Sequence, residues 1–145
     1  MITHILNKGK GDYSLCKLQE ALKKNDRIRE CGAMYSFEGF VRGVDSGKTT
    51  HKMILSTPDR AKCEKELKEM VEDIIDKYGV IDIAVVHFLG EFQAGDPLFL
   101  AVVAGAHRQE TQKALYEVVE RVEYELDFKK EEETDDGTNI IMSGG

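Results

Sequence analysis

The chain has 145 residues, of which 41% are hydrophobic and 32% are charged, and its formal net charge is −7. This length and composition are typical of one globular domain, residues 1–145, with a core large enough to need no disulfide bonds. The negative charge disfavours nucleic acid as a partner. No apolar run approaches the length of a membrane span, so we expect no membrane partner.

The N-terminus and the cysteines indicate a cytoplasmic protein. Residues 1–11, MITHILNKGKG, lack the basic-then-apolar layout of a secretory signal. Cys16, Cys31 and Cys63 are odd in number, widely spaced and without a CxxC pair, which argues against a disulfide framework and against a zinc site. We therefore expect reduced thiols, no metal site and no cofactor.

The first half of the chain is predicted to contain two helices and two strands. Residues 14–24 carry leucines at spacings of three and four, which predicts a short amphipathic helix. Residues 32–42, GAMYSFEGFVR, are rich in aromatic and β-favouring side chains and predict a strand. A turn is expected at 44–50 and a second strand at 51–56. Residues 59–78 give the clearest helical pattern, with apolar residues recurring every three or four positions.

The second half repeats this alternation of strands and helices. Residues 80–89 and 97–106 are strongly apolar strands separated by a glycine-containing turn at 90–96. A second long helix is predicted over 109–126, and a short strand over 138–142. Counted with a strand before residue 14, the order is roughly β-α-β-β-α-β-β-α-β, which favours an α+β fold with a mixed or largely antiparallel sheet and two long helices. The chain has neither GxGxxG nor a P-loop, so a doubly wound nucleotide-binding fold is disfavoured.

His107 and Arg108 form the first candidate binding site, because they stand where an apolar strand ends and a helix begins. A helix N-terminus offers free N–H groups and a partial positive charge, and an arginine there can grip phosphate oxygens in a bidentate way. Taken alone, the two residues fit better as a packed histidine and a solvated arginine at the helix end.

Phe37 and Arg42 form the second candidate, in the stretch FEGFVR. Strict alternation would place them on opposite faces of the strand, whereas a bulge at Gly39 would bring them to one side. Taken alone, they fit a core phenylalanine and an arginine at the rim.

Lys129 and Lys130 follow the second long helix and form the third candidate. A lysine beside an anion site can bind phosphate or attack a carbonyl carbon, although the pair taken alone is better explained as a charge cluster at a helix end. His87 ends a buried strand and is expected to be a satisfied core or rim residue.

Taken together, these segments resemble one family, the catalytic (large) subunit of molybdopterin synthase. The stretch GAMYSFEGFVR resembles the family's G-A-x-x-x-F-x-G-x-V-R strand, and VVHFLGEFQAGD resembles its V-x-H-R-x-G turn. The stretch VVAGAHRQETQKAL resembles its strand followed by A-H-R and a helix, and FKKEE resembles its W-K-x-E segment. The similarity covers about residues 30–131, and the four motifs occur in the family's order.

The resemblance implies an α/β hammerhead fold and a sulfurtransferase activity in molybdenum cofactor biosynthesis. It implies a homodimer in which each chain binds a small ubiquitin-like sulfur carrier with a Gly-Gly C-terminus. The carrier's thiocarboxylate supplies sulfur to cyclic pyranopterin monophosphate, which becomes molybdopterin. When the family's motifs are matched residue by residue, Lys129 corresponds to the catalytic lysine. The same match makes Phe37, Arg42, His107 and Arg108 substrate contacts, and Lys130 is added to them because it neighbours Lys129.

Three positions depart from the family pattern. The family's lysine late in the second long helix is matched by Glu123, which reverses the charge. Phe88 stands in place of the arginine after the turn histidine, and the family's Glu-x-Tyr after the second strand is replaced by STPDR. A carboxylate facing an anionic substrate is unfavourable, so we expect Glu123 to point away, to pair with Arg121 or another cation, or to mark lost activity. The alternative function is a non-catalytic paralogue that keeps the anion pocket as a binding or regulatory dimer.

The chain ends Met142-Ser143-Gly144-Gly145. A terminal Gly-Gly is typical of the carrier rather than of the large subunit. The sequence therefore raises the hypothesis that the tail docks in its own or a neighbouring pocket, against the alternative of a chance ending.

Overall fold

The structure is a computed structural model that describes residues 1–141. The elements in chain order are β1 (Ile2–Asn7), α1 (Leu15–Leu22), the 3-10 turn η1 (Ile28–Glu30), β2 (Ala33–Phe40), β3 (Val44–Asp45), β4 (Lys48–Ser56), α2 (Arg60–Tyr78), β5 (Asp82–Phe92), β6 (Pro97–Gly105), α3 (Arg108–Glu125), β7 (Lys129–Thr134) and β8 (Gly137–Ile141). The C-terminal Gly144-Gly145 pair, and with it the tail hypothesis, lies outside the described residues.

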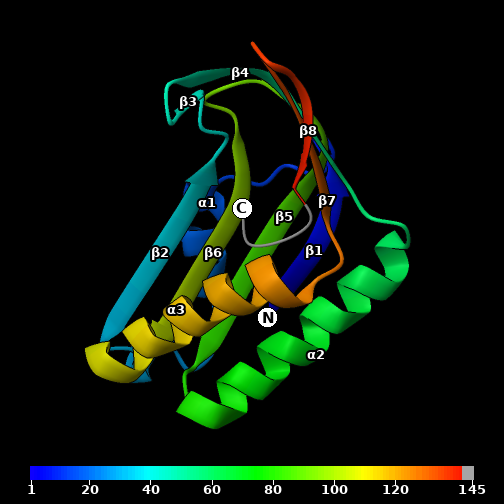
Figure 1. The fold of residues 1–145 in the computed structure, drawn as a ribbon. Coiled ribbons are helices and arrows are strands. Elements are labelled where there is room, and N and C mark those ends of the chain that lie inside the picture. The colour runs from blue at the N-terminus through cyan, green and yellow to red at the C-terminus, as the bar shows by residue number, and fades with distance from the viewer. Residues whose placement is uncertain (142–145) are drawn as a thin grey trace.

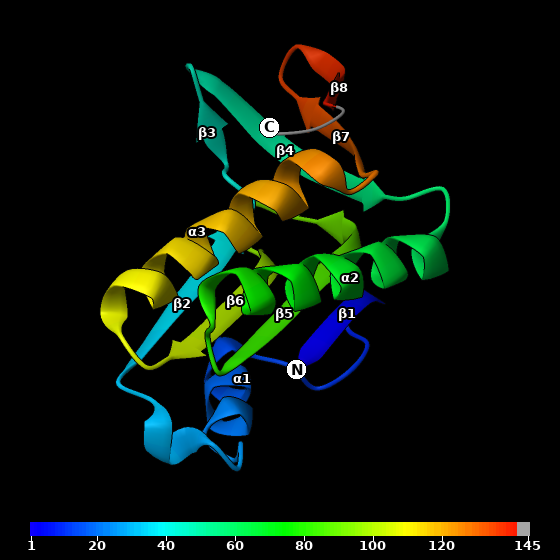
Figure 2. The same ribbon diagram turned by 90° about the horizontal axis from the view of Figure 1, so that it is seen from below.

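One sheet of eight strands organises the chain, in the order β2-β6-β5-β4-β7-β8, with β1 paired to β5 and β3 paired to β4. The β1–β5 pair is parallel and the other pairs are antiparallel. The long helices α2 and α3 lie side by side on one face, and α1 covers the other (Figures 1 and 2). The predicted α+β fold with a mixed sheet and two long helices is confirmed.

The core lies between the central strands and the two long helices. Nearly every residue of β5 and β6 is buried, because these strands have the sheet on both sides and helices on both faces. The amphipathic pattern of α2 turns Leu67, Val71 and Ile74 into this core. Its ends are fixed locally: the Asp59 side chain accepts a hydrogen bond from the Lys62 N–H, and Gly79 ends the helix at φ +64°.

The structure adds one strand where the sequence analysis assigned no element, and it corrects one predicted turn. The acidic stretch after α3 is a strand, β7, which pairs with β4 and β8 on its two sides. Only Lys130 in this strand is buried, and the other side chains are half-buried or exposed, so its run of charged residues has no apolar alternation that would predict a strand. The predicted turn at 44–50 contains the short strand β3 and the start of β4, which makes β4 a nine-residue strand.

The start of α3 is held close to the end of β6. A Cβ added at Gly105 would lie 2.2 Å from the Thr111 hydroxyl oxygen, so only glycine permits this approach. The Thr111 hydroxyl in turn donates a hydrogen bond of 2.6 Å to the carbonyl of His107. These contacts fix the N-terminus of α3, and thereby His107 and Arg108, beside the start of β2.

Candidate functional site

His107 and Arg108 stand at the N-terminus of α3, as the sequence predicted. His107 is the N-cap residue, with extended φ and ψ of −127° and 144°, and its side chain makes no capping hydrogen bond. Both residues are exposed. With Gln109 and Glu110 they line an open recess of about 300 Å³. Free helix N–H groups beside an arginine are suited to an anion, although Glu110 brings one negative charge to the same turn.

Arg42 follows β2 and lies on the surface. Its guanidinium donates a hydrogen bond of 3.2 Å to the Asp45 carboxylate, and both side chains are more than 60% exposed. An exposed ion pair of this kind contributes little to stability, so an anionic ligand can compete for the arginine. The register between β2 and β6 shifts between Gly39 and Phe40, where the sequence expected a bulge, but the extra residue is Leu98 on β6.

Phe37 opens a row of rings that crosses the sheet on the α3 side. It packs edge-on against Phe99, with ring centroids 5.3 Å apart. His87 lies 5.0 Å from Phe99 and stacks at 4.5 Å on Phe128. The row links β2, β6 and β5 to the segment between α3 and β7. Half-buried Phe37 therefore forms the exposed end of a continuous aromatic floor.

His87 is fully buried in this floor, and burial lowers its pKa to about 3. Its Nδ1 donates to the carbonyl of Phe88 at 3.1 Å, which leaves Nε2 as an acceptor. This Nε2 has no hydrogen-bond partner among residues 1–141. The charge of Lys130 also disfavours protonation of the ring. From the sequence we expected His87 to have its hydrogen bonds satisfied. The unpaired Nε2 depends on which side chains surround the ring in the folded protein, so the local sequence pattern does not predict it.

The two lysines of β7 face opposite sides of the strand. Lys129 pairs with Glu131 at 2.9 Å and keeps 45% of its side chain exposed. Lys130 has only 10% exposed and donates a hydrogen bond of 3.1 Å to Glu123. The structure thus turns Lys130, rather than Lys129, toward α3 and the aromatic floor. The role predicted for Lys129 remains a prediction.

Of the three outcomes expected for Glu123, the structure shows pairing with another cation. That cation is Lys130, because Arg121 is engaged elsewhere. The Arg121 guanidinium donates to Asp73 at 2.7 Å and to Glu125 at 2.9 Å, and so ties α3 to α2. The carboxylate of Glu123 consequently does not face the candidate site as an unpaired charge.

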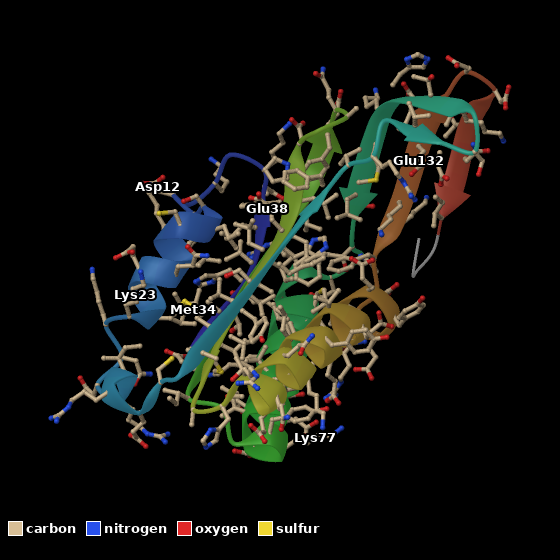
Figure 3. All side chains as sticks on the ribbon, turned by 90° about the vertical axis from the view of Figure 1, so that its left-hand side faces the viewer. Asp12, Lys23, Met34, Glu38, Lys77 and Glu132 are labelled. Atoms are coloured by element: carbon tan, nitrogen blue, oxygen red, sulfur yellow. The ribbon has the colours of Figure 1, made fainter. Side chains whose placement is uncertain are left out.

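His107 and Arg108 do not meet the other predicted cations within one chain. His107 and Glu123 are sixteen residues apart on α3, which corresponds to about 24 Å along the helix axis. Arg42 and His107 lie beyond opposite ends of the eight-residue strand β2, about 25 Å apart. In Figure 3, Met34 near the start of β2 and Glu132 in β7 lie well apart along the molecule. One end of α3 therefore carries His107 and Arg108, and the other carries Lys130 with its partner.

Other parts of the surface offer less. A recess of about 440 Å³ between β1 and α2 is lined by Thr3, Arg60 and Glu64, among others. There the Arg60 guanidinium and the Glu64 carboxylate bond the carbonyl and N–H of Ile5, so they close the free edge of β1. Within residues 1–141 there is no group of three or more His, Cys, Asp or Glu side chains suited to a metal ion. No described helix is both long and apolar enough to cross a membrane.

The chain matches one family model and is similar to proteins named as molybdopterin synthase catalytic subunits. The family model described as MoaE protein matches residues 11–125. The molybdopterin synthase catalytic subunit of Pyrococcus abyssi is 28% identical over 134 residues, covering 89% of this chain and 90% of that protein. The subunit of the same name from Synechococcus elongatus is 32% identical over 114 residues, covering 78% and 68%.

Solved structures share the fold. The molybdopterin biosynthesis MoaE protein from Burkholderia ambifaria has a TM-score of 0.79 at 24% identity, covering 100% of this chain and 92% of that one. Molybdopterin synthase from Staphylococcus aureus has a TM-score of 0.81 at 22% identity, with 96% of each chain covered. A complex of subunits 1 and 2 of molybdopterin-converting factor from Helicobacter pylori contains a chain with a TM-score of 0.70 at 19% identity, covering 97% and 89%.

The fold and site define an α+β subunit that carries cationic and aromatic groups at two separate ends of one helix, rather than in one closed pocket. The chain belongs to the MoaE family of molybdopterin synthase catalytic subunits, and its process is molybdenum cofactor biosynthesis.

Proposed function

We propose that this chain transfers sulfur from the C-terminal thiocarboxylate of a small carrier subunit to cyclic pyranopterin monophosphate. In each transfer the thiocarboxylate sulfur displaces an oxygen substituent from a pterin side-chain carbon, and water then hydrolyses the bond between that sulfur and the carrier's carbonyl carbon, which leaves the carrier with a carboxylate. Two transfers give the dithiolene of molybdopterin. Support comes from the family match and from the retained cations Arg42, His107 and Arg108. We also propose a cytoplasmic location, as the sequence predicted.

The observation that carries the proposal is the separation of the cations along α3 and β2. A single chain leaves Arg42 about 25 Å from His107, too far for both to hold one small phosphate ester. A two-fold pair of chains packed along β2 would bring the Arg42 end of one strand to the His107 end of the other. Strand β2 lies at the edge of the sheet, and its only charged residue is Glu38, so it is suited to such packing.

In this homodimer Arg42 of one chain and Arg108 of the other grip the phosphate, and His107 adds a donor. Phe37 offers its ring face to the pterin. The lysines of β7 lie beyond this floor, where the carrier tail has to arrive, and neutralise the negative charge that develops during transfer. Phosphate binding therefore draws on the N-terminal end of α3 in one chain, and sulfur transfer draws on the C-terminal end of α3 in the other chain.

A complementation experiment tests the shared site. Arg42→Ala and Arg108→Ala chains should each be inactive alone. Co-expressed and mixed at random, half of the dimers carry one chain of each kind, and one of their two sites is intact, so about one quarter of the wild-type activity returns. A site built within one chain gives no recovery on mixing.

The readout is conversion of cyclic pyranopterin monophosphate by the wild-type chain with a thiocarboxylated carrier. Turnover supports the sulfurtransferase. Absence of turnover in a folded dimer that still binds the pterin phosphate overturns it in favour of a non-catalytic paralogue.

A further inference from the structure

The ion pair between Glu123 and Lys130 joins the last turn of α3 to the start of β7. Lys130 donates its hydrogen bond across 3.1 Å, and the two side chains are 10% and 23% exposed. Among residues 1–141 the pairs of Met1 with Asp82 and of Arg121 with Glu117 are similarly withdrawn from water, whereas most other ion pairs have at least one side chain that is half exposed or nearly so. An ion pair withdrawn from water is screened less by solvent and salt, and its members are held in one geometry.

The surroundings of Lys130 leave Glu123 as its one charged anchor. No other carboxylate in the described part of the chain lies within salt-bridge distance of the Lys130 ammonium. Its neighbours across the sheet are Leu55 on β4 and Ile141 on β8, which offer no charged group. Without Glu123 the lysine side chain has several rotamers of similar energy.

His87 provides an independent sign that this end of α3 is built for a polar ligand. It is a fully buried ring whose Nε2 lacks a partner among the described residues. Buried polar groups are nearly always bonded, so an orphaned acceptor indicates a site with a role beyond packing. The ring is held neutral by burial, and therefore adds no second positive charge beside the lysine.

We propose that Glu123 is a positioning residue that fixes the ammonium of Lys130 at the sulfur-transfer end of the site. This inference rests on the proposed function, and it assigns to Glu123 the control of the position and charge of Lys130 at that same site. The carboxylate has two opposed effects. It holds the lysine in the geometry that transfer needs, and it weakens the attraction of the site for an anionic substrate.

These two effects predict that removing the Glu123 charge slows turnover, so that kcat falls, while the substrate binds more tightly, so that KM falls as well. In Glu123→Gln the amide keeps the size of the side chain but removes its charge, so Lys130 is released and the site becomes more positive. We expect kcat to fall about tenfold and KM for cyclic pyranopterin monophosphate to fall about threefold. Glu123→Asp keeps the charge on a shorter arm and should recover part of kcat.

Glu120→Gln is the matched control. Glu120 lies on the same helix, is also half-buried and makes no ion pair among the described residues. It should leave both kinetic constants unchanged. Circular dichroism and thermal unfolding of each variant verify that the fold is retained.

A second measurement does not depend on activity. Brief labelling of the whole chain with an amine-reactive acetylating reagent, followed by peptide mass spectrometry, reports how freely Lys130 reacts. Glu123→Gln should raise its labelling several-fold relative to Lys129, and Glu120→Gln should not. Unchanged labelling together with kcat within twofold of the wild type overturns the positioning role. If the wild-type chain shows no turnover, the proposed function fails, and the labelling result alone decides whether Glu123 positions Lys130.

Discussion

His87 should make a separable contribution to the acid destabilisation of this protein. The unfolded chain, with an ordinary histidine pKa near 6.5, binds a proton below that pH. In the folded protein burial lowers the pKa of His87 to about 3, and the charge of Lys130 also disfavours the protonated ring. Folded His87 therefore binds no proton until the pH approaches 3. The contribution of neutral His87 to stability is therefore intact above about pH 6.5 and is lost as the pH falls from 6.5 toward 3.

The size of the effect follows from the two pKa values. At pH 5 the unfolded state gains about 2 kcal/mol from protonating this one histidine, and the loss approaches about 5 kcal/mol near pH 3. Replacement of His87 by Phe removes the titrating group and keeps a ring between Phe99 and Phe128. His87→Leu serves as a second, smaller replacement if the larger ring strains the core.

Urea unfolding followed by circular dichroism at pH 7.5 and pH 5.0 measures the effect. Between these pH values the wild type should lose about 2 kcal/mol more than His87→Phe, which corresponds to a midpoint difference of about 1 M urea. The comparison between the two proteins cancels the contributions of carboxylates and of the exposed histidines, which both proteins share. Equal losses in the two proteins, within about 0.5 kcal/mol, refute the assignment of His87 as a buried neutral group.

Three further outcomes are expected. Arg108→Ala should weaken binding of a phosphate-bearing pterin more than tenfold in calorimetry, because a charge-assisted contact of about 1.5–3 kcal/mol is lost; unchanged affinity removes Arg108 from the site. Lys130→Met should cost about 1–2 kcal/mol in urea unfolding by leaving Glu123 unpaired, and pairing it with Glu123→Leu should restore part of that loss; additive losses contradict the ion pair. Gly105→Ala should cost about 2 kcal/mol or more, because its Cβ meets the Thr111 hydroxyl at 2.2 Å; a smaller loss shows that α3 shifts freely.

The elements that the sequence predicted well are those whose signals are local. The helix α2 was predicted because its apolar residues recur every three or four positions over nineteen residues. The strands β5 and β6 were predicted because both of their faces are buried, which produces continuous apolar runs. In these segments hydrophobic patterning and local backbone preference favour the same element. The predicted and observed elements therefore differ little except at their ends.

Strand β7 had no such local signal. Its residues 129–134, KKEEET, resemble a solvated charge run, and only pairing with β4 and β8 makes them a strand. Backbone hydrogen bonds to two neighbours can hold a polar sequence in extended form when one face is partly covered. The sequence lacks that information because the partners are distant along the chain.

The same distinction applies to the site. The sequence by itself supplied the candidate site residues, because the four ordered motifs contain Phe37, Arg42, His107, Arg108 and the lysines after α3. Only the tertiary structure decided how they are distributed. It put His107 and Lys130 at opposite ends of α3 and paired Lys130 with Glu123. Residue identity is a property of the sequence, whereas the distance between two charges depends on how many residues of helix and strand separate them in space.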